Sequence, residues 1–106
     1  MPLTFNQTES GTIATLSGEF TIGTLEDLKA PMLEMLEHFN LQLNLSQVTE
    51  FDGAGLQLLK IVLTEATRRN RPIVLEHVNA HMSECMQLLG FEVAVADPEE
   101  TQHGSL

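Results

Sequence analysis

The sequence predicts an α/β domain: a mixed β-sheet, built from an N-terminal hairpin and parallel strands, with helices packed mainly on one face. Two alternating segments joined by a turn open the chain, and strand-like and helix-like segments then take turns along it. Strand–helix–strand units require crossover connections, so the later strands run parallel. At 106 residues and 42% hydrophobic composition, one domain can bury a core without disulfides or metal.

The hairpin is predicted from period-two patterns on either side of a turn at Ser10–Gly11. Leu3 and Phe5 alternate with polar residues before the turn. After it, residues 12–20 alternate as well, although Ile13 breaks the pattern and its face stays open. The residues expected on one side of this second strand are Ala14, Leu16, Gly18 and Phe20.

The first helix is predicted after Thr24, which resembles a cap with Asp27 three residues later. Pro31 removes an interior hydrogen bond, so we expect a kink near Ala30 or a helix that begins at Pro31. The predicted apolar stripe comprises Leu25, Leu28, Met32, Met35 or Leu36, and Phe39.

A second strand–helix unit follows, with a strand over Leu41–Leu45 that ends near Leu45. The next helix begins near Gly53 and ends before Pro72. Cations favour the C-terminal end of a helix, so we interpret Arg68, Arg69 and Arg71 as dipole-stabilising and solvated rather than as an anion site. The apolar face of this helix is predicted to contain Leu56, Leu59, Val62, Leu63 and Ala66.

The remaining segments complete one domain over residues 1–97. A short strand is predicted at residues 73–75, a third helix capped by Asn79 and stopped by Gly90, and a last strand at residues 91–95. Residues 98–106 are polar and acidic, and we expect a flexible tail. The core stripe of the third helix is expected to contain Met82, Cys85 or Met86, and Leu89.

Charge and cysteine usage narrow the classes of partner. The formal net charge of −10 disfavours nucleic acid and direct binding to anionic membranes, and it favours a basic protein surface. The alternative is that the negative charge only keeps the protein soluble and indicates no particular partner. The single cysteine, the N-terminus without signal-peptide features and the lack of a long apolar run indicate a cytoplasmic protein.

No catalytic or cofactor motif emerges from the residues, so we expect a non-enzyme without cofactor. His77, His81 and Cys85 are spaced by four and could hold zinc on one continuous helix. The predicted strand end at His77 and the cap at Asn79 interrupt that helix. A buried, inert thiol at Cys85 is therefore the preferred interpretation, with no metal site.

The junction VTEFDGAGLQLL, residues 48–59, is the candidate site. Asp52 occupies the cap position of the second predicted helix. Gly53 and Gly55 weaken the first turn, which implies close packing, unusual dihedrals or the approach of another backbone. Phosphate binding at this helix start is disfavoured, because Asp52 and Glu50 oppose an anion and no lysine of a phosphate loop follows.

The helix after the glycines carries more apolar surface than one sheet face needs. Leu58 and Ile61 lie off the centre of the stripe, and exposed they would extend a docking patch beside Gly53. Contact of these two residues with a neighbouring helix, or with a second copy of the domain, is the alternative.

Ordered motifs along the chain resemble the STAS domain family, named for sulfate transporters and anti-sigma-factor antagonists. The stretch LNLSQVTEFDGAGLQLLKIVLTEA is similar to the family's strand, its Leu-Ser-x-Val-x-x-Ile-Asp-Ser-x-Gly-Leu signature and its Leu-rich helix. LSGEF at residues 16–20 and HMSECMQLLGFE at residues 81–92 resemble further family motifs. The likeness extends to about Asp97 and implies the same mixed sheet with one-sided helices.

The resemblance implies a bacterial protein-interaction module of the anti-sigma-factor antagonist type. In many members a partner kinase phosphorylates the Ser or Thr after the Asp, a position held here by Gly53. Ala54 is also inert, and Ser46 and Thr49 fall outside the matching position. The alternative is a cytoplasmic accessory subunit of an ABC-type lipid-transport complex. The expected partner-binding residues are Glu50, Asp52, Gly53, Ala54, Gly55, Leu56, Gln57, Leu58 and Ile61.

Expected partners are a kinase-type anti-sigma factor, a component of a chemotaxis-type kinase pathway, or another STAS protein, with a homodimer possible. Because Gly53 has no oxygen to phosphorylate, the domain is expected to stay competent to bind.

Overall fold

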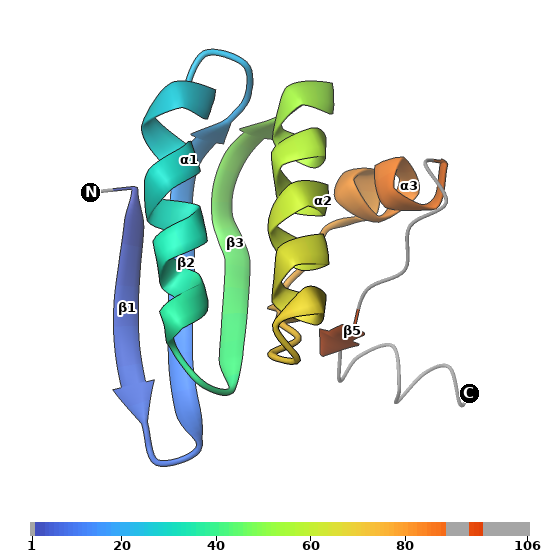
Figure 1. Ribbon diagram of the computed structural model, residues 1–106. Coiled ribbons are helices and arrows are strands. Elements are labelled where there is room, and N and C mark those ends of the chain that lie inside the picture. The colour runs from blue at the N-terminus through green and yellow to red at the C-terminus, as the bar shows by residue number, and fades with distance from the viewer. Residues whose placement is uncertain (1, 89–93, 97–106) are drawn as a thin grey trace.

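A computed structural model of the protein describes residues 2–88 and 94–96, and it contains a five-stranded sheet in the order β1-β2-β3-β4-β5. The hairpin strands β1 (Leu3–Thr8) and β2 (Gly11–Phe20) pair antiparallel. All later pairings, with β3 (Leu41–Phe51), β4 (Val74–Glu76) and β5 (Ala94–Ala96), are parallel. The predicted fold class, a mixed sheet opened by a hairpin, is confirmed (Figure 1).

The helices lie mainly over one face of this sheet. α1 (Leu25–Glu34) and α2 (Gly53–Arg68) run side by side in front of it, and α3 (Ala80–Leu88) lies beside α2 (Figure 1). Burial alternates along β3, where Leu41, Leu43 and Leu45 face the helices. The largest fully buried side chains are Phe20, Leu3, Leu16, Leu28, Met32, Met35, Leu36, Leu43, Leu45, Leu59, Leu75 and Met82.

The strand expected to end near Leu45 continues to Phe51, so that boundary was wrong. Two register shifts along β2, between Thr15 and Ser17 and between Gly18 and Glu19, let parallel pairing with β3 resume after each irregularity. Such irregularities re-aim side chains and break the period-two pattern that marks a strand. The extension carries the chain directly to the cap of α2.

The first helix contains Pro31 and directly follows Thr24. α1 runs from Leu25 through Pro31 to Glu34 and passes into a 3₁₀ turn, Met35–Glu37, so the alternative in which it begins at Pro31 is wrong. Thr24 occupies the N-cap position, as expected, but its side chain makes no capping hydrogen bond. Its hydroxyl donates to the carbonyl oxygens of Glu19 (2.8 Å) and Thr21 (3.2 Å), and thus closes the loop between β2 and α1 instead.

Phe39, expected in the core, is 65% exposed because the 3₁₀ turn ends before it. The Arg71 guanidinium lies 4.2 Å from the centre of its ring and faces the carbonyl oxygens of Leu36 and Glu37. Arg68 and Arg69 both bind Glu65, at 2.6 and 2.8 Å. The contacts of the three arginines are with a carboxylate, backbone carbonyls and an aromatic ring of the domain itself. They agree with a structural role and not with an anion site.

The C-terminal third follows the predicted order. β4 is displaced by one residue from the expected 73–75, although Ile73 is still buried. Asn79 caps α3, since its side-chain oxygen accepts the N–H of Met82 at 2.8 Å. Met82 and Met86 are buried, as expected. The predictions for Leu89, Gly90, residues 91–93 and the tail at 98–106 concern residues outside the described ones, while β5 overlaps the last predicted strand.

Candidate partner-docking site

Asp52 organises the junction between β3 and α2. One carboxylate oxygen accepts the N–H of Gly55 at 3.0 Å, as a helix cap does, and the other accepts the N–H of Ile22 at 3.1 Å. These two donors, Gly55 foremost, hold the pKa of the Asp52 carboxyl below its ordinary value. The acid thus ties the loop after β2 to the first turn of α2.

Gly55 is required by the packing of the chain on itself. A Cβ at this position would overlap the carbonyl oxygen of Phe20 and stand 3.2 Å from Phe20 Cγ. The first turn of α2 therefore lies against the end of β2 with no room for a side chain. Of the explanations weighed for the glycine pair, close packing is the one that applies to Gly55.

Gly53 is in the opposite situation. A Cβ added there would meet no atom within 4 Å, and the residue is exposed as the first of α2. Nothing in its own packing requires glycine. The described chain leaves this corner uncovered, so the backbone of the first helical turn is accessible to another molecule.

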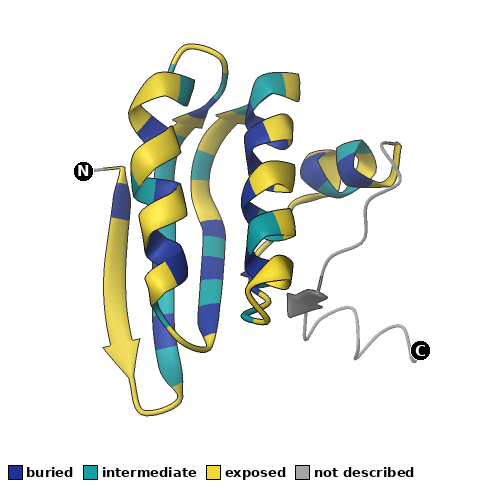
Figure 2. Ribbon diagram, viewed as in Figure 1, coloured by how far each residue is buried: buried dark blue, intermediate teal, exposed yellow. Residues whose placement is uncertain are grey.

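Exposed apolar side chains lie on either side of this corner. Ile22, whose N–H is held by Asp52, is 69% exposed, and Ile61, two turns into α2, is 55% exposed. Gln57 is exposed and, at a spacing of four from both Gly53 and Ile61, lies on the same side of α2. Figure 2 shows exposed positions recurring along the side of α2 that faces away from the sheet. We define the docking surface as Ile22, Gly53, Ala54, Gln57 and Ile61; the sequence patterns did not single out Ile22.

Three expected members are buried and do not reach this surface: Gly55, Leu56 and Leu58. Leu56 is 4% exposed and Leu58 is 3% exposed. Both belong to the hydrophobic core. Of the two interpretations left open for the off-centre residues, packing inside the domain applies to Leu58, whereas the exposed Ile61 agrees with the docking patch.

Like charges border the docking surface. Glu19 and Glu50 are opposite each other in the parallel pairing of β2 with β3, and both are exposed. Neither forms an ion pair within residues 2–88. Opposed like charges on neighbouring strands are destabilising, so this end of the sheet offers two carboxylates to a cation from outside.

The family follows from a comparison with domain models. The model described as "Mlab, STAS domain" matches residues 3–96. The chain belongs to the STAS domain family. No curated protein matches the sequence.

Solved structures of other proteins share the fold at low sequence identity. The anti-sigma factor antagonist SpoIIAA, in its unphosphorylated form, is 16% identical, with a TM-score of 0.68 over 97% of this chain and 96% of that one. RsbS from Moorella thermoacetica is 14% identical, with a TM-score of 0.72 over 91% and 86% of the two chains. A sulfate transporter family protein from Wolinella succinogenes is 22% identical, with a TM-score of 0.60 over 74% and 66%.

The other hydroxyls near the STAS signature lie away from the docking surface. Ser46 and Thr49 are exposed on β3, seven and four positions before Gly53. The N–H of Ser46 donates to the side-chain oxygen of Asn44 at 2.9 Å, which shapes the strand locally. Neither residue occupies the start of α2.

The remaining candidate set, His77, His81 and Cys85, does not form one face. His77 has a positive φ of 62° and precedes α3, while His81 and Cys85 lie on the helix with Sγ 4.0 Å from Nε2. Among the described residues, no three His, Cys, Asp or Glu side chains are grouped to hold a metal ion. Over the same residues, every helix is too short or too polar to cross a membrane.

Proposed function

We propose that this STAS domain is a non-catalytic protein-interaction module of a bacterial regulatory system that docks on its partner through the N-terminal end of α2. The observation that carries the proposal is Gly53, the exposed first residue of α2, which no packing constraint requires to be glycine. A bare backbone at this point admits close approach by a partner's main chain.

The docking surface has the physical character of an interface. Ile22 and Ile61 supply apolar area on either side of the accessible helix start. The Glu19–Glu50 pair adds negative charge at its border. We therefore expect the partner to place a lysine or arginine against the two carboxylates and apolar side chains against the isoleucines.

Gly53 also determines how the complex is regulated. A phosphate at the start of α2 would add almost two negative charges to a surface already bordered by carboxylates. Gly53 and Ala54 have no hydroxyl to receive one. The module is therefore always competent to bind, and regulation belongs to the state or supply of the partner.

Two measurements test the proposal. Intact-mass analysis after incubation with ATP and a serine kinase of the same pathway should show no added phosphate, and a gain of one phosphate contradicts us. Affinity purification from native cells should recover a partner with the wild-type chain and much less of it with Gly53→Asp. Equal recovery by both would place the interface elsewhere, and thermal melts confirm that the variant is folded.

A second candidate is an accessory subunit of an ABC-type lipid-transport complex. The missing hydroxyls at residues 53 and 54 favour it too, because a permanently assembled subunit needs no phosphorylation switch. The purified partner discriminates between the two: a kinase-type anti-sigma factor or a chemotaxis-type kinase in the first case, an ATPase and permease in the second.

A further inference from the structure

The outer edge of the sheet, β1, lacks the features by which proteins block exposed edges. Its six residues, LTFNQT, include no charged residue and no proline, and the pairing with β2 runs through without a register shift. Natural edge strands are blocked by charges, prolines or bulges, or are kept very short. The opposite edge, β5, has three residues and is of the short kind.

The backbone groups that β1 presents outward follow from its pairing. The N–H of Ser17 donates to the carbonyl of Pro2 at 2.7 Å, so this pair is hydrogen-bonded. Hydrogen-bonded pairs alternate along antiparallel strands, so Thr4, Asn6 and Thr8 direct their N–H and C=O groups toward β2. Leu3, Phe5 and Gln7 therefore direct theirs away from the sheet.

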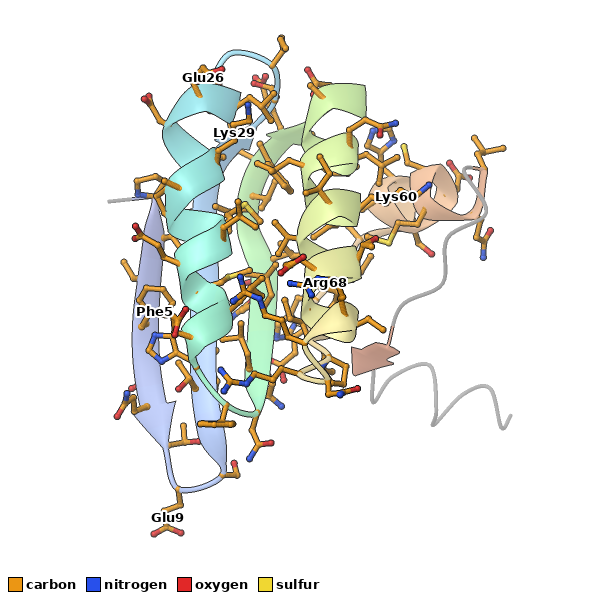
Figure 3. The ribbon with its side chains drawn as sticks, in the orientation of Figure 1. Phe5, Glu9, Glu26, Lys29, Lys60 and Arg68 are labelled. Atoms are coloured by element: carbon orange, nitrogen blue, oxygen red, sulfur yellow. The ribbon has the colours of Figure 1, made fainter. Side chains whose placement is uncertain are left out.

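An apolar side chain lies at the middle of this edge. Phe5 is 44% exposed, and its ring stacks on His38 with 4.9 Å between centroids. Figure 3 shows Phe5 at the outer margin of the sheet, on the strand farthest from α2. Phe5 is also the middle member of the three residues whose backbone groups point outward.

These features favour a second copy of the same chain as the occupant. Antiparallel pairing about Phe5 places Phe5 opposite Phe5 of the second copy and Leu3 opposite Gln7. The outward N–H and C=O groups of one copy can then hydrogen-bond to those of the other. The sheet would continue through both copies, and the two phenylalanines would form a cross-strand aromatic pair. Because the chain carries a net charge of −10, two copies can approach most easily along an uncharged segment.

We infer that the protein forms a two-fold homodimer by antiparallel pairing of β1 with β1 of a second copy, centred on Phe5. The contact is one strand wide, which is typical of a weak and reversible association. It lies along the outer edge of β1, whereas the docking surface lies where β2 and β3 end and α2 begins, so each copy keeps that surface available. The inference does not depend on the proposed function.

Sedimentation equilibrium from about 10 µM to 1 mM tests the dimer, because a contact at the small end of interface sizes dissociates in this range. The wild-type mass should rise toward twice that of one chain. Added salt should strengthen the association by screening the like net charges. Phe5→Lys should weaken it at least tenfold, whereas Gln57→Lys, with the same change of charge on α2, should not.

A second variant separates backbone pairing from the side chain. Gln7→Pro removes only an outward N–H, which an edge strand tolerates, and it should also abolish the dimer while the melting temperature stays close to wild type. In hydrogen exchange, the amides of Phe5 and Gln7 should gain protection with protein concentration. A wild-type monomer at 1 mM, a dimer that survives Phe5→Lys, or a β1 edge protected only when a different protein is added would each overturn the inference.

Discussion

The two glycines at the start of α2 should respond in opposite ways to alanine. At Gly53 an added Cβ has no neighbour within 4 Å. Alanine there also restricts the unfolded chain and suits the helix, so Gly53→Ala should stabilise the domain by about 0.4–1 kcal/mol. At Gly55 the Cβ would overlap the Phe20 carbonyl oxygen, which belongs to backbone inside the sheet and cannot rotate away.

Gly55→Ala must therefore displace α2 from β2. Overpacking of this kind costs about 1–3 kcal/mol. For a domain of this size each kcal/mol corresponds to about 4–8 °C in melting temperature. We expect Gly55→Ala to melt roughly 10 °C below wild type, and Gly53→Ala to melt at or a few degrees above it, by circular dichroism with urea titrations as a second measure.

The two alanine variants also separate an effect on partner binding from an effect on stability. If Gly53 is glycine for the sake of a partner, Gly53→Ala should bind that partner more weakly although it is at least as stable. A Gly53→Ala chain that is destabilised by more than about 1 kcal/mol would show that we have misjudged the space around it. A Gly55→Ala chain of wild-type stability would refute the close approach of Phe20.

Substitutions at three further residues, Asp52, Glu65 and Glu50, test the charges. Asp52→Ala should lower the melting temperature more than Asp52→Asn, and its effect should shrink in acid, because a carboxyl with a lowered pKa stabilises above its unfolded pKa and loses this effect as pH falls. Glu65→Gln follows the same sign: Arg68 and Arg69 lower the pKa of Glu65 from 4.5 to about 2, so its melting difference from wild type should be full above about pH 5 and vanish near pH 2. Glu50→Gln should stabilise the domain by a few tenths of a kcal/mol by removing a like charge opposite Glu19, yet weaken binding of a basic partner at low salt. A partner that binds Glu50→Gln as tightly as wild type at low salt would exclude a cation at this pair.

The sequence was sufficient for the fold where a segment obeys one simple period. The hairpin, the leucine strand and the amphipathic α2 were predicted from patterns of two and of 3.6 residues. The extent of β3 was not, since its continuation past Leu45 depends on register shifts against β2 that leave no periodic signal. Likewise, the hydroxyl of Thr24 hydrogen-bonds to the carbonyl oxygens of Glu19 and Thr21 and not to the first turn of the helix. This partner depends on the path of the loop, which the local sequence does not show.

For the candidate site, the sequence predicted the helix cap but not which residues around it are exposed. The cap role of Asp52 follows from local sequence and is confirmed. Its second bond, to Ile22, joins residues thirty positions apart, and no local pattern contains it. Leu58 and Ile61 could not be distinguished by sequence because both lie off the centre of the stripe; only the surrounding elements decide that Leu58 is buried.

The open space around Gly53 has a consequence for how such a module can change. A serine introduced at this position would have its hydroxyl in solvent and no neighbour to displace. A module that works as proposed is thus one substitution away from carrying a modifiable side chain, with no repacking of the interior. Because the site tolerates a side chain, a phosphorylation switch could be gained or lost in evolution while the fold stays unchanged.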